Sequence, residues 1–165
     1  MLSILPDLSR LLFPGSLGIA VSVGAFLILL FVFNRVTPEG PFDFGKDFQT
    51  QLAVYLDIAK FVLGLAAGGI VLIVSASTLR INAVVPGASP PRLPQAYASP
   101  MATLAMTIFY GVLFMAFLAY DFDVAKIDPN SYTRWKYVKN QTLGFSTLAC
   151  FCIGYIWLVF AAVLS

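Results

Sequence analysis

The sequence QLAVYLDIAKFVLGLAAGGIVLIVSASTLR at residues 51–80 is the strongest indication of the fold, because residues 61–79 form a run of nineteen without a charge. Nineteen residues make a helix of about 28 Å, close to the roughly 30 Å hydrocarbon core of a bilayer. Inside this run Gly64 and Gly68 form a GxxxG step beside Gly69. Small residues at this spacing let a second helix approach closely in lipid. The stretch therefore predicts a transmembrane helix with one face suited to helix packing.

Three more apolar runs have the length of a transmembrane helix, so we predict four spans, at about 15–34, 52–79, 100–120 and 142–164. Of the 165 residues, 59% are hydrophobic and 11% are charged, whereas soluble domains carry about 25% charged residues. Four spans and their loops use up this length, so we expect no soluble domain. The sequence predicts a single membrane domain over residues 1–165, an all-α integral membrane protein with a four-transmembrane-helix bundle.

The segments between the spans also carry information. Residues 1–13 place three leucines on one face and both charged residues off it, the pattern of a short interfacial helix; they are equally compatible with the first turns of the first span. The loop at 36–50 is so short that we expect the first two spans to be antiparallel neighbours. The linker at 81–99 contains four prolines, which favour an extended chain outside the membrane.

The third span has recognisable ends. Ser99 followed by Pro100 is typical of an N-cap with a proline in the first helical turn. Asp121 is expected to end the helix, and residues 121–141 then form a loop that is acidic at first and basic and aromatic later.

Small residues recur on two other spans. Gly18 and Ser22 form a small-xxx-small step in the first span, and Cys150 and Gly154 continue such a face in the fourth. Cys150 and Cys152 point about 200° apart on a helix of 3.6 residues per turn, so they do not form a mutual disulfide. We interpret both cysteines as small packing residues.

Two groups of charged residues lie near the expected membrane surface. Asp57 and Lys60 are one turn apart at the start of the second span, and we interpret them as an interfacial ion pair that fixes the height of the helix. An ion or proton pathway is the alternative, but the deep parts of the spans contain no carboxylate. The second group precedes the fourth span and comprises Arg134, Trp135, Lys136, Tyr137 and Lys139. It is typical of an interfacial anchor, or else of a contact with anionic lipid headgroups or with a partner.

The distribution of cations predicts an orientation. Seven lysines and arginines lie on the side of the loops at 35–51 and 121–141, and three lie on the side of the termini and the linker. By the positive-inside rule the two loops face the cytoplasm and both termini face outside. Acidic residues also concentrate on the loop side, but the rule gives them little weight. We expect the membrane to be a bacterial inner (plasma) membrane.

The residue types argue against catalysis. Histidine is absent, which lowers the expectation of haem, zinc or proton-shuttling sites. We find no nucleophile with a base, no paired carboxylates at depth and no phosphate-binding loop, and so expect no enzyme, cofactor, metal or soluble substrate. Ten cations against eight acidic residues do not indicate a nucleic-acid partner.

The first functional hypothesis is therefore a structural or accessory subunit of a larger membrane protein complex, which acts through helix packing and lipid contacts. The alternative is a self-oligomerising channel or membrane-perturbing effector. Its pore would be lined by the sparse hydroxyls of the spans, namely Ser75, Ser77, Thr103, Thr107 and Ser146. A third hypothesis, a transporter of a small apolar or lipid-like substrate, needs no charged site but requires a cavity.

Overall fold

The computed structural model of the chain describes residues 15–40, 48–82 and 95–164. All regular structure in these ranges is helical, in the order α2 (Gly15–Val36), α3 (Phe48–Asn82), the short 3-10 helix η1 (Gln95–Tyr97), α4 (Ala98–Ile127), the 3-10 helix η2 (Pro129–Ser131) and α5 (Arg134–Leu164). Each of the four α-helices contains a segment long and apolar enough to cross a membrane. The prediction of an all-α, four-helix membrane protein is confirmed. The interfacial helix predicted at 1–13 and most of the linker predicted at 81–99 lie outside the described residues.

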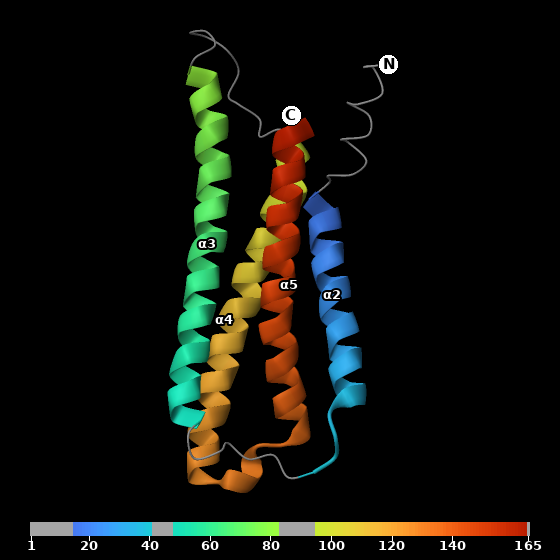
Figure 1. Cartoon of the computed structure of the whole chain (residues 1–165), viewed down its shortest axis with the longest axis vertical. Helices are drawn as coiled ribbons and strands as arrows, with labels where there is room; N and C mark the ends of the chain where they lie inside the picture. Colours follow the sequence, from blue (N-terminus) through green and yellow to red (C-terminus); the bar gives the residue numbers. More distant parts are fainter. Residues whose placement is uncertain (1–14, 41–47, 83–94, 165) are drawn as a thin grey trace.

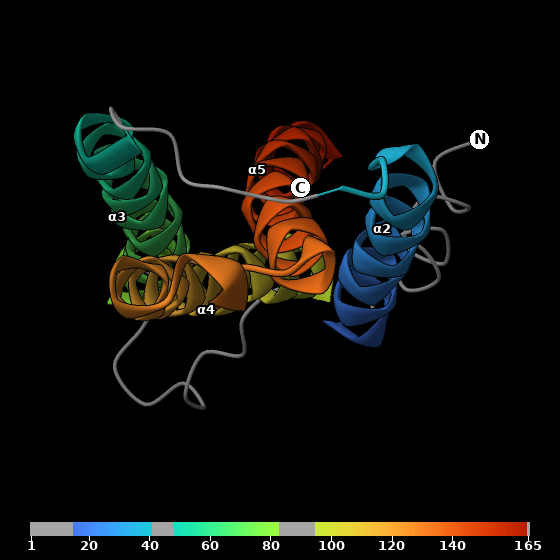
Figure 2. The same ribbon diagram turned by 90° about the horizontal axis from the view of Figure 1, so that it is seen from below.

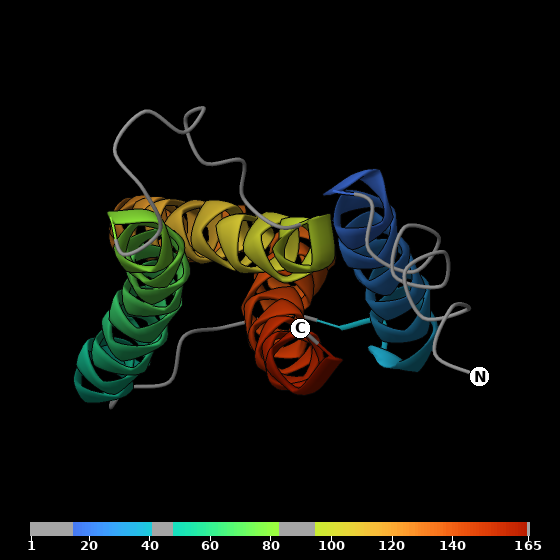
Figure 3. The same ribbon diagram turned by 90° about the horizontal axis from the view of Figure 1, so that it is seen from above.

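The four helices alternate in direction along the long axis of the molecule (Figure 1). Each is continuous because a backbone in hydrocarbon must satisfy its polar groups internally. α4 and α5 form the central pair, α2 packs against both of them, and α3 packs mainly against α4. Views from the two ends show α2 and α3 on opposite sides of this pair (Figures 2 and 3). α3 and α5 have few contacts with one another, among them the hydrogen bond that Tyr155 of α5 donates to the backbone oxygen of Leu65 at 2.7 Å.

The expectation that the first two spans are neighbours is wrong. α2 and α3 are antiparallel, but α4 and α5 separate them. The connection from 37 to 47 has eleven residues, and a chain of that length reaches up to about 36–40 Å when extended. It is therefore long enough to pass the end of the central pair, and loop length alone did not determine adjacency.

The boundaries of the last two helices also differ from the predicted ones. α4 does not end at Asp121 but continues to Ile127, and α5 already begins at Arg134. Most of the loop predicted at 121–141 is therefore helical. Asp121 does not end the helix because its side chain is only 1% exposed and pairs with two lysines of α5. A charge with partners on a neighbouring helix does not have to leave the helical segment for water.

The start of α4 lies two residues before the predicted one, at Ala98 instead of Pro100. Tyr97 is the N-cap, with a helical backbone because η1 leads directly into α4. Ser99 is therefore already helical and does not cap. Pro100 is the third residue of the helix, where its missing N–H has no partner within the helix in any case.

Leu104 marks the place where three helices meet. It is fully buried, and a Cβ added to Gly69 or Gly154 would lie 3.2 Å or 2.9 Å from its side-chain carbons. The two glycines, from α3 and α5, thus form a hole for this leucine, and Ala66 and Ile73 of α3 complete the cluster. Such close packing is the main source of helix association where lipid removes the hydrophobic drive.

Candidate functional site

The glycines predicted to pack helices fall into two groups. The side chain of Leu104 fills the space beside Gly69 and Gly154. Gly18 lies against α4, where an added Cβ would come within 2.5 Å of the backbone oxygen of Ser99. These three glycines therefore serve the bundle itself. Gly111 and Gly144 have the same role, against Leu63 and Phe114, and the sequence reasoning missed them because neither belongs to a GxxxG step.

Gly64 and Gly68 form the other group, because they point away from the rest of the chain. A Cβ added to either glycine would meet no atom of the described residues within 4 Å. Large apolar side chains flank the two glycines along the same side of α3. We call this surface the outer face of α3, and it consists of Phe61, Gly64, Leu65, Gly68, Val71 and Leu72, which are all exposed.

The other predicted packing residues lie inside. Ser22 is fully buried, and its hydroxyl donates to the backbone oxygen of Gly18 at 2.8 Å. Tyr110 of α4 donates in turn to the backbone oxygen of Ser22 at 3.5 Å. Cys150 is buried in the α4–α5 region, whereas Cys152 is exposed. The two thiols therefore lie in different environments.

The Asp57–Lys60 pair is present but exposed. Lys60 Nζ lies 3.4 Å from Asp57 Oδ1, and the two side chains are 66% and 74% exposed. An exposed pair one turn apart on a helix stabilises it by only about 0.3–0.5 kcal/mol in water. The pair is a surface ion pair, and its role in fixing the height of the helix at the membrane interface stays a prediction.

The basic and aromatic segment at the start of α5 mostly faces inward. Arg134 donates to the backbone oxygen of Thr37 at 3.0 and 3.1 Å, to Asn34 Oδ1 at 3.0 Å and to the backbone oxygen of Asn34. These carbonyls lie at the C-terminal end of α2, where helical carbonyls lack partners within the helix. The guanidinium therefore caps α2 from α5, and its positive charge suits the negative end of the α2 dipole.

The lysines of this segment meet Asp121 of α4. Lys139 Nζ lies 3.0 Å from Asp121 Oδ2, and Lys136 Nζ lies 3.6 Å from Oδ1. Asn140 Nδ2 donates to Oδ2 at 3.0 Å. Lys139 also lies over the ring of Phe117, 4.1 Å from its centroid. A polar cluster that joins α4 to α5 is thus formed by Asp121, Lys136, Lys139 and Asn140. Lys136 and Lys139, which the sequence predicted to contact lipids or a partner, instead form ion pairs with Asp121 of the same chain.

The aromatic residues of this segment are Trp135 and Tyr137, and Tyr132 lies just before it. Tyr137 Oη accepts a hydrogen bond from Gln141 Nε2 at 2.8 Å. Tyr132, just before α5, is 6% exposed. Burial raises the pKa of Tyr132 to about 12, and the negative charge of Asp121 adds to the rise, while the side chain of Asn140 opposes it. Trp135 is 58% exposed, so it remains available as an interfacial anchor.

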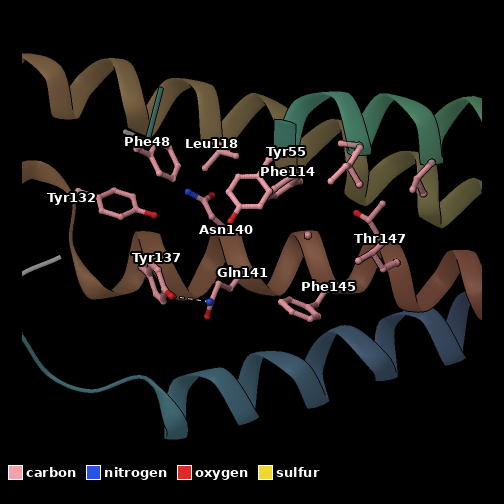
Figure 4. A pocket seen from close by; sticks show the side chains of 15 residues that line it. Phe48, Tyr55, Phe114, Leu118, Tyr132, Tyr137, Asn140, Gln141, Phe145 and Thr147 are labelled. Atoms are coloured by element: carbon pink, nitrogen blue, oxygen red, sulfur yellow. Dashed lines mark hydrogen bonds between the residues drawn. The ribbon is translucent and has the colours of Figure 1, made fainter. Parts of the chain in front are cut away.

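A cavity of about 360 Å³ lies between α3, α4 and α5. Figure 4 shows Tyr132, Tyr137, Asn140 and Gln141 toward the end where α5 begins and Thr147 toward the other end, with the amide of Asn140 between the rings of Tyr132 and Tyr55. Asn140 is 3% exposed, and its Oδ1 has no hydrogen-bond partner among the described residues. A buried acceptor without a partner costs about 1–3 kcal/mol. Sequence reasoning missed this cavity because no periodicity shows a gap between helices.

The hydroxyls considered for a pore are placed in three ways. Thr103, Thr107 and Ser146 are fully buried inside the protomer. The two threonines donate to backbone oxygens of their own helix, at 2.9 and 3.1 Å. Ser75 is exposed, and the side chain of Ser77 lies outside the described residues. Few of these hydroxyls are thus at a surface that a second copy could share.

No group of three or more His, Cys, Asp or Glu side chains that could hold a metal ion occurs in the described residues. The arrangement is one of contact surfaces, a capped helix end, a polar cluster and a cavity. Comparisons with family models, with curated proteins and with solved structures find no match to this chain.

Proposed function

We propose that the protein is an accessory subunit of a larger membrane protein complex and that a transmembrane helix of another subunit docks on the outer face of α3. The observation that carries the proposal is the open space at Gly64 and Gly68. The other glycines of the predicted packing steps contact side chains or backbone of this chain. The GxxxG step thus has a shape suited to helix contact, and its two glycines have no contact with any other helix in the part of the chain that the structure describes.

The physical argument concerns the cost of a glycine pair that faces lipid. Glycine in the interior of a helix is less favourable than alanine by about 0.8–1.0 kcal/mol. Lipid tails adapt to a helix surface of any shape, so contact with lipid does not explain why two positions one turn apart lack side chains. A docked helix explains it, because the absence of side chains lets two backbones approach and gain dispersion contacts. Phe61 and Leu72, both exposed, flank the glycines and supply the ridges around such a contact.

The orientation belongs to the same proposal. The end of the bundle where α2 ends and α5 begins holds Arg35, Lys126 and the three cations of the α5 start. We infer that this end faces the cytoplasm of a bacterial inner membrane, with the start of α2 and the end of α5 toward the outside. Single cysteines introduced at Glu39 and at Ser16 in a protein without Cys150 and Cys152 test it. A membrane-impermeant maleimide added to whole cells should label the cysteine at position 16 and not the one at 39.

The main test is native mass spectrometry of the protein released gently from its own membrane. It reports the identity and the copy number of bound chains together. The variants Gly64→Leu and Gly68→Leu place a side chain where the partner would approach, with no atom of the described chain in the way. Gly24→Leu in α2 is the matched control, because a Cβ at Gly24 would likewise meet no described atom within 4 Å.

We expect other membrane proteins bound in a fixed ratio to the parent protein and to Gly24→Leu. The same proteins should be lost, or lowered several-fold, with Gly64→Leu and Gly68→Leu. Partners that stay bound to both of these variants would contradict docking on the outer face of α3. A closed ring of this chain alone would contradict the subunit proposal and make conductance in reconstituted bilayers the next measurement.

A further inference from the structure

The cavity between α3, α4 and α5 is graded from polar to apolar along the bundle. Most of its polar lining comes from Tyr132, Tyr137, Asn140 and Gln141, near the start of α5. Thr147 lines the other end, but its hydroxyl already donates to the backbone oxygen of Leu143 at 2.8 Å. Its other end is lined mainly by apolar side chains, such as Val62 of α3 and Leu148 of α5. Tyrosine and amide side chains are typical of the membrane interface, and the apolar end extends into the predicted span. The cavity therefore has the polarity gradient of a lipid with its head at the surface.

The cavity is reachable from the side. Tyr55 and Ile58 of α3 line it and are 46% and 49% exposed. Phe145 and Leu148 of α5 line it as well and are 52% and 42% exposed. These exposed side chains belong to the two helices that barely touch one another. The opening therefore lies between α3 and α5, where a molecule dissolved in the bilayer can enter without crossing water.

Asn140 lines this cavity and carries an acceptor that has no donor among the described residues. Its Nδ2 donates to Asp121 at 3.0 Å, which fixes the amide orientation, because the reversed amide would place its oxygen against a carboxylate. Oδ1 is then the remaining polar atom, and it has no partner among the described residues although the side chain is 3% exposed. A buried acceptor in such a place is best satisfied by a hydrogen-bond donor on a ligand.

The electrostatics of the site favour an uncharged ligand. Among the described residues that line the cavity there is no lysine, arginine, aspartate or glutamate. The nearby Asp121 contacts Lys136 and Lys139, so these charges already have partners. An ionised headgroup would lose its hydration here without meeting a free opposite charge.

We propose that this cavity binds an uncharged membrane lipid with a hydroxyl headgroup, which donates to Asn140 Oδ1 while its apolar body lies between α3 and α5. From Asn140 to Leu148 the α5 side of the site is eight residues, about 12 Å along the helix. That length accommodates the ring body of a sterol or the first part of the acyl chains of a diacylglycerol. The shared chemistry is a neutral hydroxyl on an apolar body.

The test uses the full chain in phosphatidylcholine vesicles that carry one photoreactive lipid at a time. The three probes are a diazirine diacylglycerol, a diazirine sterol and a diazirine phosphatidylcholine, each with the photoreactive group in its apolar part. After illumination, mass spectrometry of peptides locates the crosslinks. We expect at least one of the two hydroxyl lipids to label residues of α3 between 55 and 62 or of α5 between 144 and 148. The phosphatidylcholine probe should label them several-fold less.

Two variants connect the labelling with the cavity. Ala59 lines the cavity and is 6% exposed, so Ala59→Phe should fill part of it and lower the labelling at least fivefold. Ala53→Phe is the matched control on the same helix, because Ala53 is exposed and does not line the cavity. Its labelling should equal that of the parent protein.

The headgroup contact is tested on the parent protein, which removes any question of misfolding. Unlabelled diacylglycerol or sterol should compete with the probe, and the corresponding O-methyl ether, which has no hydroxyl proton to donate, should compete at least fivefold less well. Labelling by the diacylglycerol probe or by the sterol probe identifies which lipid supplies the hydroxyl, and labelling by either one supports the site. Equal labelling by all three lipids would mean bulk lipid contact only and would overturn the proposal. So would labelling that Ala59→Phe leaves unchanged, or an O-methyl ether that competes fully.

Discussion

The contact between α2 and α4 predicts a measurable difference between two glycine-to-alanine substitutions in the same helix. In Gly18→Ala the new Cβ would lie 2.5 Å from the backbone oxygen of Ser99 and 3.0 Å from atoms of Ala102 and Thr103. In Gly24→Ala the new Cβ would meet no atom within 4 Å in residues 15–40, 48–82 and 95–164. The first substitution therefore crowds a helix interface, and the second tests the helix alone.

The magnitude follows from the geometry. Ordinary van der Waals contact begins at 3.4 Å, so α2 and α4 must separate by about 0.9 Å (3.4 minus 2.5) at Gly18. The clashing atom belongs to the backbone and does not rotate away. A gap of 0.5–1 Å removes about a quarter to a half of the dispersion energy of the atoms across it, and overpacking of this kind costs about 1–3 kcal/mol. The intrinsic gain of alanine over glycine, about 0.8–1.0 kcal/mol, is common to both variants.

The assay is reversible unfolding in mixed detergent micelles, followed by circular dichroism as the fraction of sodium dodecyl sulfate rises. Gly18→Ala should have a free energy of unfolding about 1–3 kcal/mol lower than that of Gly24→Ala. Because the difference is taken between two variants of α2, the helix propensity cancels. Equal stability of the two proteins, or a more stable Gly18→Ala, would refute the close approach of α2 to α4.

Three further predictions concern the end of the bundle where α5 begins. Asp121→Ala should lower the free energy of unfolding by roughly 1.5–3 kcal/mol, because it removes a buried charged acceptor. The control Asp123→Ala, at a side chain that is 75% exposed, should change it by at most about 0.5 kcal/mol. Equal losses of stability in the two variants would contradict the buried cluster. The pKa of Tyr132 is raised from 10.0 to about 12, so the folded protein keeps a proton that the unfolded chain releases, and stability should fall as the pH rises through this window. Between unfolding curves recorded below pH 10 and near pH 12, the free energy of unfolding of Tyr132→Phe should fall less than that of the parent protein. An equal fall in both proteins would speak against this prediction. Arg134→Lys cannot make the same set of hydrogen bonds, so it should speed amide hydrogen exchange at the C-terminal end of α2. The matched change Arg35→Lys should not. Unchanged exchange in Arg134→Lys would argue against capping of α2 by Arg134.

The sequence was a sound guide to the transmembrane helices and a poorer one to their ends. Long uncharged runs can satisfy their backbone in lipid only as helices, so their number and type follow from the pattern. Asp121 led to a wrong helix end because the rule that a charge leaves the membrane assumes that it has no partner. Its partners, Lys136 and Lys139, are more than ten residues away, and nothing in local sequence shows that the three side chains meet.

The packing residues show the same division. A small-xxx-small pattern identifies surfaces that admit another helix, but it does not say whether the partner belongs to the same chain. Gly18 and Gly154 contact α4 of this chain, whereas Gly64 and Gly68 contact no other helix among the residues that the structure describes. The basic segment before the fourth span was recognised by its composition, yet Arg134 proved to cap α2, which requires the end of one helix and the start of another to be side by side.

The four membrane-spanning helices follow from the amino-acid sequence alone, because the cost of an unsatisfied backbone in hydrocarbon acts on each segment separately and is visible in its composition. The contacts between helices, the separation of α2 from α3, and the cavity beside α5 with an acceptor unpaired among the described residues become visible only in the folded structure. Those outcomes depend on the fit of side chains from distant segments, such as Leu104 between Gly69 and Gly154. Fit of this kind is a property of pairs of surfaces and is not present in any one stretch of the chain.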